Sequence, residues 1–153
     1  FKGTGRRFEL KKIVRDIMII DDYAHHPTEI MATLEAAKRG WRRRRVVVFQ
    51  PHRFSRLSLL LKSFATAFTD ADVLITTEIY AAGEKPIAGV SGRVLYQEIK
   101  QSGHKNVFFE HNMKNIPPLV GKVAQSGDLI LALGAGDIYK IIPDIIKTLE
   151  GRG

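Results

Sequence analysis

The sequence contains no cysteine, so it can form neither disulfides nor thiolate metal sites. No apolar run approaches the roughly 20 residues that a helix needs to cross a bilayer, so we expect no membrane partner. Residues 1–7 have no apolar stretch after their basic side chains and do not resemble a signal peptide. A cytoplasmic location fits these absences.

Several catalytic motifs are also missing. Nothing matches the phosphate loop G-x-x-x-x-G-K-[ST], and in Gly134-Ala135-Gly136 the third glycine of a dinucleotide fingerprint would fall at Tyr139. No serine or threonine lies in a nucleophile-elbow pattern, so covalent catalysis has no candidate. Asp21-Asp22 and His25-His26 could suggest a metal, but adjacent residues leaving a strand point to different sides. We therefore expect no metal site.

The chain has 153 residues, which predicts one domain, and its net charge is +8. Much of the excess charge comes from Arg42-Arg43-Arg44-Arg45 and from Arg6-Arg7. Clustered arginines can bind nucleic acid by releasing counterions from phosphates, so a basic nucleic-acid-binding module is one hypothesis. The alternative, which we favour, is a solvated loop that leads into a strand. Only Trp41 is an aromatic neighbour, so no base-stacking platform is indicated and we expect no nucleic-acid partner.

Apolar runs predict six strands. Residues 7–13 alternate between polar and apolar, which is typical of an edge strand with one wet face. Short buried runs follow at 17–20, 46–49, 73–75, 107–109 and 129–133. Segments with helical spacing separate them, which indicates βαβ units. The fold class is therefore α/β: a Rossmann-like three-layer domain with a mostly parallel six-stranded sheet and an N-terminal antiparallel edge strand.

Local signals place the helices between these strands. A helix is expected over 27–39, and a second should carry Leu57, Leu60, Leu61, Phe64 and Phe68 on one face and end at 70–72. Ser91 can cap a third helix, and a fourth starts around Pro117-Pro118. Pro143 should kink or break the last one.

Two polar turns follow buried strands. Asp21-Asp22-Tyr23-Ala24-His25-His26-Pro27 comes after the run 17–20, and Gln50-Pro51-His52-Arg53-Phe54-Ser55-Arg56 comes after 46–49. Right-handed crossovers would bring the turns at 21–26, 50–56, 76–90 and 134–137 to one end of the sheet, around a common ligand space. Arg53 and Arg56 lie where a helix begins, a poor place for a cation, so their guanidinium forks favour an anionic ligand.

These two turns resemble the Mur ligases of peptidoglycan synthesis. Phe1-Lys2-Gly3 with Arg6-Arg7-Phe8-Glu9, the segment 80–87 and Gly134-Ala135-Gly136-Asp137 match as well. The resemblance covers essentially the whole chain, 1–153. It implies a C-terminal, amino-acid-binding domain whose N-terminal UDP-sugar domain and central ATPase domain are absent from this chain.

The resemblance implies an ATP-dependent ligase of bacterial cytoplasm, inactive as this domain alone. The family member that it favours joins L-alanine to UDP-N-acetylmuramate: ATP phosphorylates the sugar-borne carboxylate, and the amine of L-alanine attacks the acyl phosphate. Magnesium ligands are expected mainly in the missing domains. By the same resemblance Asp22 would hold the ATP ribose, and Tyr23 and His25 would line the space between phosphate and amino acid. A role for His25 in accepting the amine proton would make it catalytic.

The resemblance also implies an acceptor site after the second buried strand. Arg53 and Arg56 would clamp the L-alanine carboxylate, and His52 would lie beside its small side chain. A related ligase that recycles murein tripeptide onto the same UDP-sugar shares the Asp-Asp and Ala-His-His-Pro pattern, so it stays as an alternative. The segment 51–56 favours the alanine enzyme.

Overall fold

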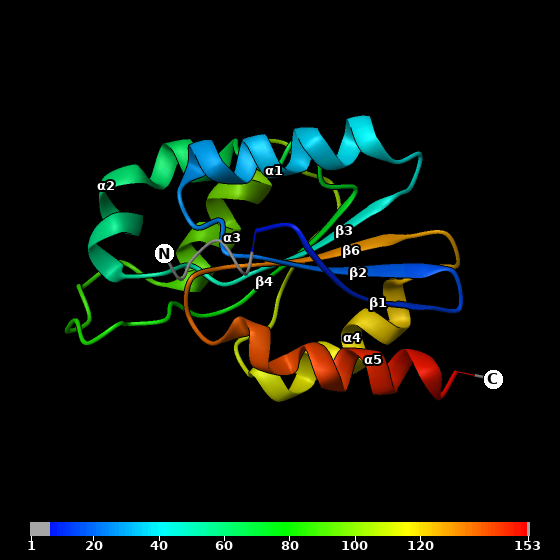
Figure 1. Cartoon of the computed structure of the whole chain (residues 1–153). Helices are drawn as coiled ribbons and strands as arrows, with labels where there is room; N and C mark the ends of the chain where they lie inside the picture. Colours follow the sequence, from blue (N-terminus) through cyan, green and yellow to red (C-terminus); the bar gives the residue numbers. More distant parts are fainter. Residues whose placement is uncertain (1–6, 153) are drawn as a thin grey trace.

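The computed structural model describes residues 7–152, in three layers. A twisted sheet forms the middle layer; helices α1, α2 and α3 cover one face, and α4 and α5 cover the other (Figure 1). The predicted Rossmann-like fold class is confirmed. Residues 1–6 of the motif that begins at Phe1 lie outside the described part.

Six strands form the sheet, in the order β1-β2-β6-β3-β4-β5. Their bounds are β1 Glu9–Val14, β2 Ile17–Asp22, β3 Arg45–Phe49, β4 Val73–Thr76, β5 Val107–Phe109 and β6 Leu129–Leu133. Strand β1 pairs antiparallel with β2, and every other pairing is parallel. The last strand along the chain, β6, therefore lies between β2 and β3, and the turns that follow these three strands emerge side by side.

The helices are α1 Pro27–Gly40, α2 Phe54–Ala65, α3 Gly92–Gln101, α4 Ile116–Val123 and α5 Ile142–Glu150, with short 3₁₀ helices η2 Met113–Asn115 and η3 Ile138–Ile141. The Ser91 side chain accepts a hydrogen bond from the Val94 backbone at the start of α3, so the predicted cap is confirmed. The predicted break at Pro143 is confirmed too, because η3 ends and α5 begins next to it.

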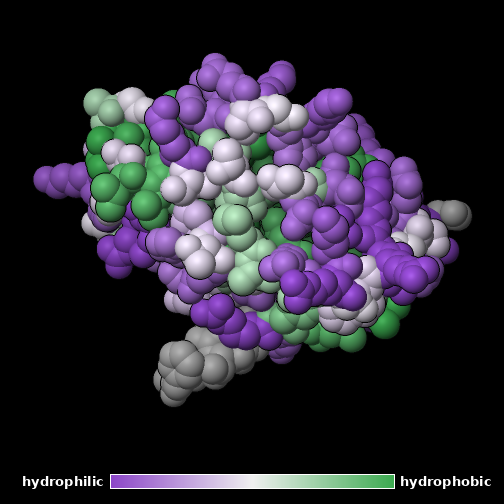
Figure 2. Space-filling view, turned by 90° about the horizontal axis from the view of Figure 1, so that it is seen from above, coloured by the Kyte–Doolittle hydropathy of each residue, from purple (hydrophilic) through white to green (hydrophobic). Residues whose placement is uncertain are grey.

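The helix after β3 is shorter than its apolar spacing predicts. It ends at Ala65, and Leu60 has non-helical dihedral angles of φ −115° and ψ 21° that kink it. Phe68 packs on Phe49 at 5.0 Å between ring centroids, but from the turn beyond the helix. Leu59, next to the kink, is 82% exposed, and Figure 2 shows hydrophobic side chains gathered at the end of this largely hydrophilic face where α2 lies. The prediction of one continuous apolar helix to 70–72 is wrong.

The arginine run 42–45 meets acidic groups where β3, β4 and β6 begin. Arg43 donates to the Asp16 carboxylate at 3.0 Å, and Arg45 lies 3.4 Å from that of Asp72. Arg44 donates through two nitrogens to Asp128, which is buried, and these hydrogen bonds raise the pKa of Arg44. Three of the four side chains thus pair within the chain, which favours a structural role over the nucleic-acid hypothesis.

Replacing Asp128 with alanine should lower the free energy of unfolding by about 2 kcal/mol. The carboxylate also accepts the backbone N–H of Gln125 at 2.7 Å, so the variant leaves that part-buried donor without an acceptor and leaves the Arg44 guanidinium with the Val123 carbonyl alone. Urea unfolding monitored by circular dichroism measures the change. The exposed ion pair Glu35–Arg39 supplies the control: Glu35→Ala should cost less than about 0.5 kcal/mol. Equal losses would mean that the buried pair contributes no more than a surface pair.

Candidate functional site

Four turns meet at the carboxyl ends of the parallel strands. The Gly134 N–H donates to the Asp22 carbonyl at 3.2 Å, which joins the turns after β6 and β2. The Gln50 amide donates to Asp137 at 2.7 Å, and His52 forms an isolated parallel bridge with the later loop. The four turns that the chain order predicts at one end of the sheet therefore lie together, although they come from segments more than 100 residues apart. A common ligand space between them stays a prediction.

Asp22 lies beneath this space. Its buried carboxylate accepts hydrogen bonds from the Phe8 N–H at 3.0 Å, the Ala24 N–H at 2.8 Å and the Thr33 hydroxyl at 3.3 Å. These contacts fix the path of the turn after β2. A carboxylate can accept about four hydrogen bonds, so one acceptor position remains for an outside group. The ribose-binding role of Asp22 stays a prediction, restricted to that position.

The His25 imidazole has a defined tautomer. Its Nδ1 lies 2.9 Å from the Tyr23 carbonyl oxygen and 3.5 Å from a carboxylate oxygen of Glu29, and neither oxygen can donate. Nδ1 must therefore carry the proton, and in the neutral ring Nε2 keeps a lone pair. The ring stands edge-on to Tyr23 at 5.3 Å and to His52 at 5.7 Å between centroids. His25 thus joins the two polar turns.

The neighbouring histidine has a different task. His26 caps α1: its Nδ1 accepts from the Thr28 N–H at 3.3 Å, while Glu29 accepts from the backbone N–H groups of His25 and His26, both at 3.1 Å. Partial burial raises the pKa of Glu29, but these donors and nearby cations together hold it below its ordinary value. This capping box, with Pro27 in the first turn, fixes the start of the helix directly after His25.

His52 is held as a neutral ring. Arg56 donates from Nη1 to His52 Nδ1 at 3.0 Å and to the His52 carbonyl at 3.0 Å, so His52 Nε2 carries the proton. Burial first, then the charges of Arg56, His25 and Arg53, lowers the pKa of His52 to about 4. Tyr80 stacks on the ring at 5.6 Å with an interplanar angle of 10°. His52 is therefore a fixed hydrogen-bond donor near neutral pH.

Arg53 and Arg56 have different surroundings. The Arg56 guanidinium is partly occupied by His52, whereas that of Arg53 is 45% exposed and lies 3.8 Å from Glu84. Both come from the first turn or N-cap of α2 and so belong to the same end of the sheet. Binding of one carboxylate by both side chains stays a prediction.

Sequence reasoning gave no role to Gln50, which proves central. Its buried amide donates to Asp137 at 2.7 Å and accepts from the Ile138 N–H at 3.1 Å. A Cβ atom at Gly136 would lie 2.5 Å from Tyr80 Cγ and 2.7 Å from the Gln50 side-chain oxygen. The glycine thus lets the turn after β6 approach the other turns. The only sequence signal was a polar residue directly after a buried strand.

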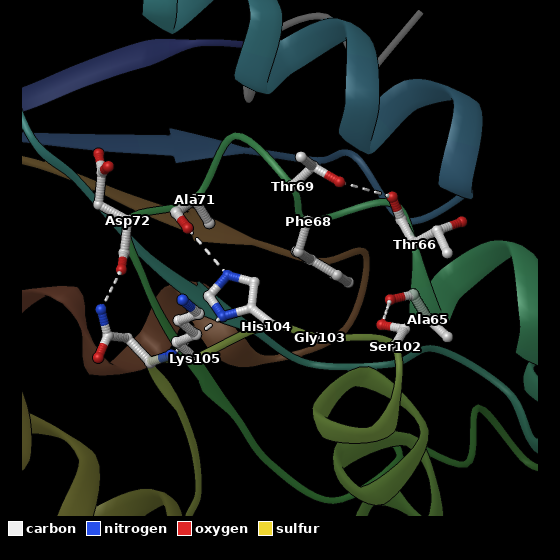
Figure 3. A pocket seen from close by; sticks show the side chains of 11 residues that line it. Ala65, Thr66, Phe68, Thr69, Ala71, Asp72, Ser102, Gly103, His104 and Lys105 are labelled. Atoms are coloured by element: carbon white, nitrogen blue, oxygen red, sulfur yellow. Dashed lines mark hydrogen bonds between the residues drawn. The ribbon is translucent and has the colours of Figure 1, made fainter.

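A hollow of about 340 Å³ lies at the opposite end of the sheet, before β4 and β5 (Figure 3). Its polar side chains bond to backbone groups around the hollow. His104 donates from Nε2 to the Ala71 carbonyl at 2.9 Å and accepts at Nδ1 from the Asn106 N–H, and the Ser102 hydroxyl bonds to backbone carbonyls. It has no side chain in common with the four turns, so it is not the candidate site.

Among residues 7–152, no three His, Cys, Asp or Glu side chains come together as a metal site. No helix in the described range has the length and apolar character to span a bilayer.

Residues 6–136 match a family model described as "Mur ligase, glutamate ligase domain". The chain is 49% identical over 151 residues to UDP-N-acetylmuramate–L-alanine ligase of Geotalea uraniireducens (strain Rf4), covering 99% of this chain and 33% of that protein. It thus spans about a third of the length of the curated relatives it matches.

Solved structures agree. The UDP-N-acetylmuramate–alanine ligase of Thermotoga maritima is 29% identical with a TM-score of 0.76, covering 93% of this chain and 29% of that one. A murein peptide ligase of Psychrobacter arcticus 273-4 is 25% identical with a TM-score of 0.79, covering 97% and 30%.

Proposed function

The chain belongs to the Mur ligase family, and from this premise we propose that it is the C-terminal, amino-acid-binding domain of an ATP-dependent ligase that joins L-alanine to UDP-N-acetylmuramate. The domain spans the whole chain, and the UDP-sugar and ATPase domains belong to the rest of a longer protein. Relatives three times as long as this chain support this arrangement. So does the absence of a phosphate loop from the sequence.

The observation that carries the proposal is that two arginines and two histidines lie at one end of the sheet. One of the histidines offers a hydrogen-bond donor and the other offers an acceptor. An α-amino acid presents a carboxylate and an amine. Arg53 and Arg56 offer guanidinium forks for the carboxylate, and charge-assisted hydrogen bonds of this kind contribute about 1.5–3 kcal/mol each. His52 is a fixed donor, and His25 keeps a lone pair on Nε2.

His25 is the proposed catalytic residue. The amine of L-alanine must lose a proton as the new amide bond forms, and an imidazole nitrogen with a free lone pair can accept it. Tyr23 fixes the ring through its backbone carbonyl and contacts it through its own ring. Tyr23 and His25 would then line the space between the phosphate and the amino acid. Holding the amine against the activated carboxylate is a proximity effect.

ATP activates the sugar-borne carboxylate in the proposed reaction. Asp22, with one acceptor position left, would hold the ribose at the edge of this domain. By the family resemblance the magnesium ligands are assigned mainly to the preceding domains, and no step of this domain is derived through the metal.

The runner-up is the ligase that recycles murein tripeptide onto the same UDP-sugar. The similarity to a murein peptide ligase, with a TM-score of 0.79, favours this alternative. Alanine is preferred because the curated relatives named as alanine ligases are 44–50% identical to this chain. Kinetics of the longer protein with L-alanine and with tripeptide as competing acceptors would decide between them by the ratio of kcat/KM.

Arg53→Ala in the longer protein should raise the KM for L-alanine at least about tenfold, because one charge-assisted contact to the carboxylate is lost. The KM for UDP-N-acetylmuramate should stay within about twofold, since Arg53 lies in the acceptor space. Steady-state kinetics with each substrate varied in turn measures both constants.

Arg53→Lys is the matched variant, because it keeps the charge and removes the fork. Its KM for L-alanine should lie between those of the wild type and of Arg53→Ala. An unchanged L-alanine KM in Arg53→Ala would count decisively against the proposed acceptor site.

A further inference from the structure

Arg53 has an unfavourable backbone conformation. Its φ of +78° with ψ of 132° lies in a region that favours glycine and that residues with side chains rarely adopt. Such a conformation persists only when its surroundings hold it. Arg53 is also the N-cap of α2, yet its side chain makes no capping hydrogen bond. Other residues must therefore fix both its backbone and the start of the helix.

The loop after β4 supplies the backbone contacts. The Arg53 N–H donates to the Tyr80 carbonyl at 2.8 Å, and the Tyr80 N–H donates to the Pro51 carbonyl at 2.8 Å. These hydrogen bonds form the short parallel bridge between His52 and Tyr80. The backbone of the acceptor turn is thus held by the segment that begins at Tyr80.

Four residues later, the same loop supplies the missing cap. Glu84 accepts the Ser55 N–H at 3.0 Å with one carboxylate oxygen and a hydrogen bond from the Ser55 hydroxyl with the other. The hydroxyl first, then the N–H, lowers the pKa of Glu84, so it is charged at neutral pH. The Glu84 N–H donates to the Ala81 carbonyl at 3.0 Å and so closes a turn over residues 81–84. Ala82 and Gly83 lie in this turn with positive φ angles of +53° and +84°.

The same carboxylate lies 3.8 Å from the Arg53 guanidinium. From this geometry we propose that Glu84 is a positioning residue, which holds the Arg53 side chain ready for the carboxylate of the acceptor. An arginine side chain in water loses rotamer freedom when it binds, and a partner that restricts it beforehand reduces that loss. The inference rests on the proposed function and adds to it the group that orients Arg53.

Glu84→Gln in the longer protein isolates the charge. Glutamine has the same size and keeps an oxygen that can accept from Ser55, but it no longer attracts the guanidinium. We expect the L-alanine KM to rise about fivefold, with kcat and the UDP-N-acetylmuramate KM within about twofold of the wild type. Glu35→Gln, the same change in an exposed pair on α1, should leave all three constants unchanged.

A double-mutant cycle separates positioning from capping. If Glu84 acts through Arg53, then Arg53→Ala combined with Glu84→Gln should have the same L-alanine KM as Arg53→Ala alone. If Glu84 only caps α2, its effect should persist in the Arg53→Ala background and follow the melting temperature. If glutamine lowers the melting temperature below the assay range, Glu84→Asp replaces it in the same cycle, because the shorter side chain sets the carboxylate back from the Arg53 guanidinium.

Two results would overturn the inference. Additive effects in the cycle would show that Glu84 acts independently of Arg53, and a lower L-alanine KM in Glu84→Gln would show that Glu84 competes with the acceptor. An unchanged KM in Arg53→Ala alone is a different outcome, because it would refute the acceptor site and not only the role of Glu84.

Discussion

Replacing His25 with alanine in the longer protein should lower kcat by a factor of about 100 or more, the usual contribution of a positioned general base. His25 Nδ1 donates to the Tyr23 carbonyl at 2.9 Å, so Nε2 is the only ring nitrogen that can accept a proton from the L-alanine amine. The KM values should change less than kcat, because neither the Arg53 nor the Arg56 guanidinium bonds to the His25 ring among the described contacts. Single-turnover kinetics with a saturating acceptor isolates the chemical step.

The pH dependence of kcat identifies the group that acts. A base must be unprotonated, so the wild-type rate should fall on the acid side as the base gains its proton, and this acid limb should vanish in His25→Ala. His52 cannot supply the limb above pH 5, because its pKa is lowered to about 4 and Arg56 occupies its Nδ1. An acid limb that survives in His25→Ala would refute the proposed base.

The adjacent imidazole gives a matched control for this prediction. His26 acts as a helix cap, and asparagine is among the best N-cap residues, so His26→Asn should retain kcat within about threefold. A loss as large as that of His25→Ala would mean that both imidazoles serve the reaction.

Local sequence patterns predicted most of the fold for a clear physical reason. In a parallel sheet covered on both faces, the strands read as short, fully apolar runs, and 129–133 is buried at every position. The helix after β3 shows where this reasoning fails. Apolar spacing records which side chains face the core, but it does not record that the backbone leaves helical geometry at Leu60 or that the helix ends at Ala65. Phe68 therefore packs on Phe49 from a turn and not from the helix.

The candidate site was predicted in part. The turns around His25 and Arg53 follow from polar residues placed directly after buried strands. The role of each residue within these turns does not follow from the sequence, because it depends on partners that are distant in the chain. The Asp22 carboxylate, for example, accepts the N–H of Phe8, which lies directly before the edge strand β1. Glu84 caps the start of α2 from 29 residues away, and no local sequence pattern at Ser55 predicts that contact.

Gly136 links the fold to the proposed acceptor space, and Gly136→Ala should damage both. The new methyl group would lie 2.5 Å from Tyr80 Cγ and 2.7 Å from the Gln50 side-chain oxygen, so at least one of them must move. Such overpacking lowers the free energy of unfolding by about 1–3 kcal/mol. A displaced Tyr80 would carry with it the stacked His52 ring and the hydrogen bond to the Arg53 N–H. We therefore expect kcat/KM for L-alanine to fall about 100-fold in the longer protein.

Urea unfolding and steady-state kinetics on the same preparation separate the two effects. Gly40→Ala is the matched control, because it adds the same methyl group at the end of α1 where no atom lies within 4 Å. It should leave both stability and kinetics within error, or raise the stability slightly through the helix propensity of alanine. A Gly136→Ala protein that is destabilised but keeps the wild-type kcat/KM would show that Tyr80 can move without disturbing the acceptor. In that case the stacking of Tyr80 on His52 would contribute to the fold alone.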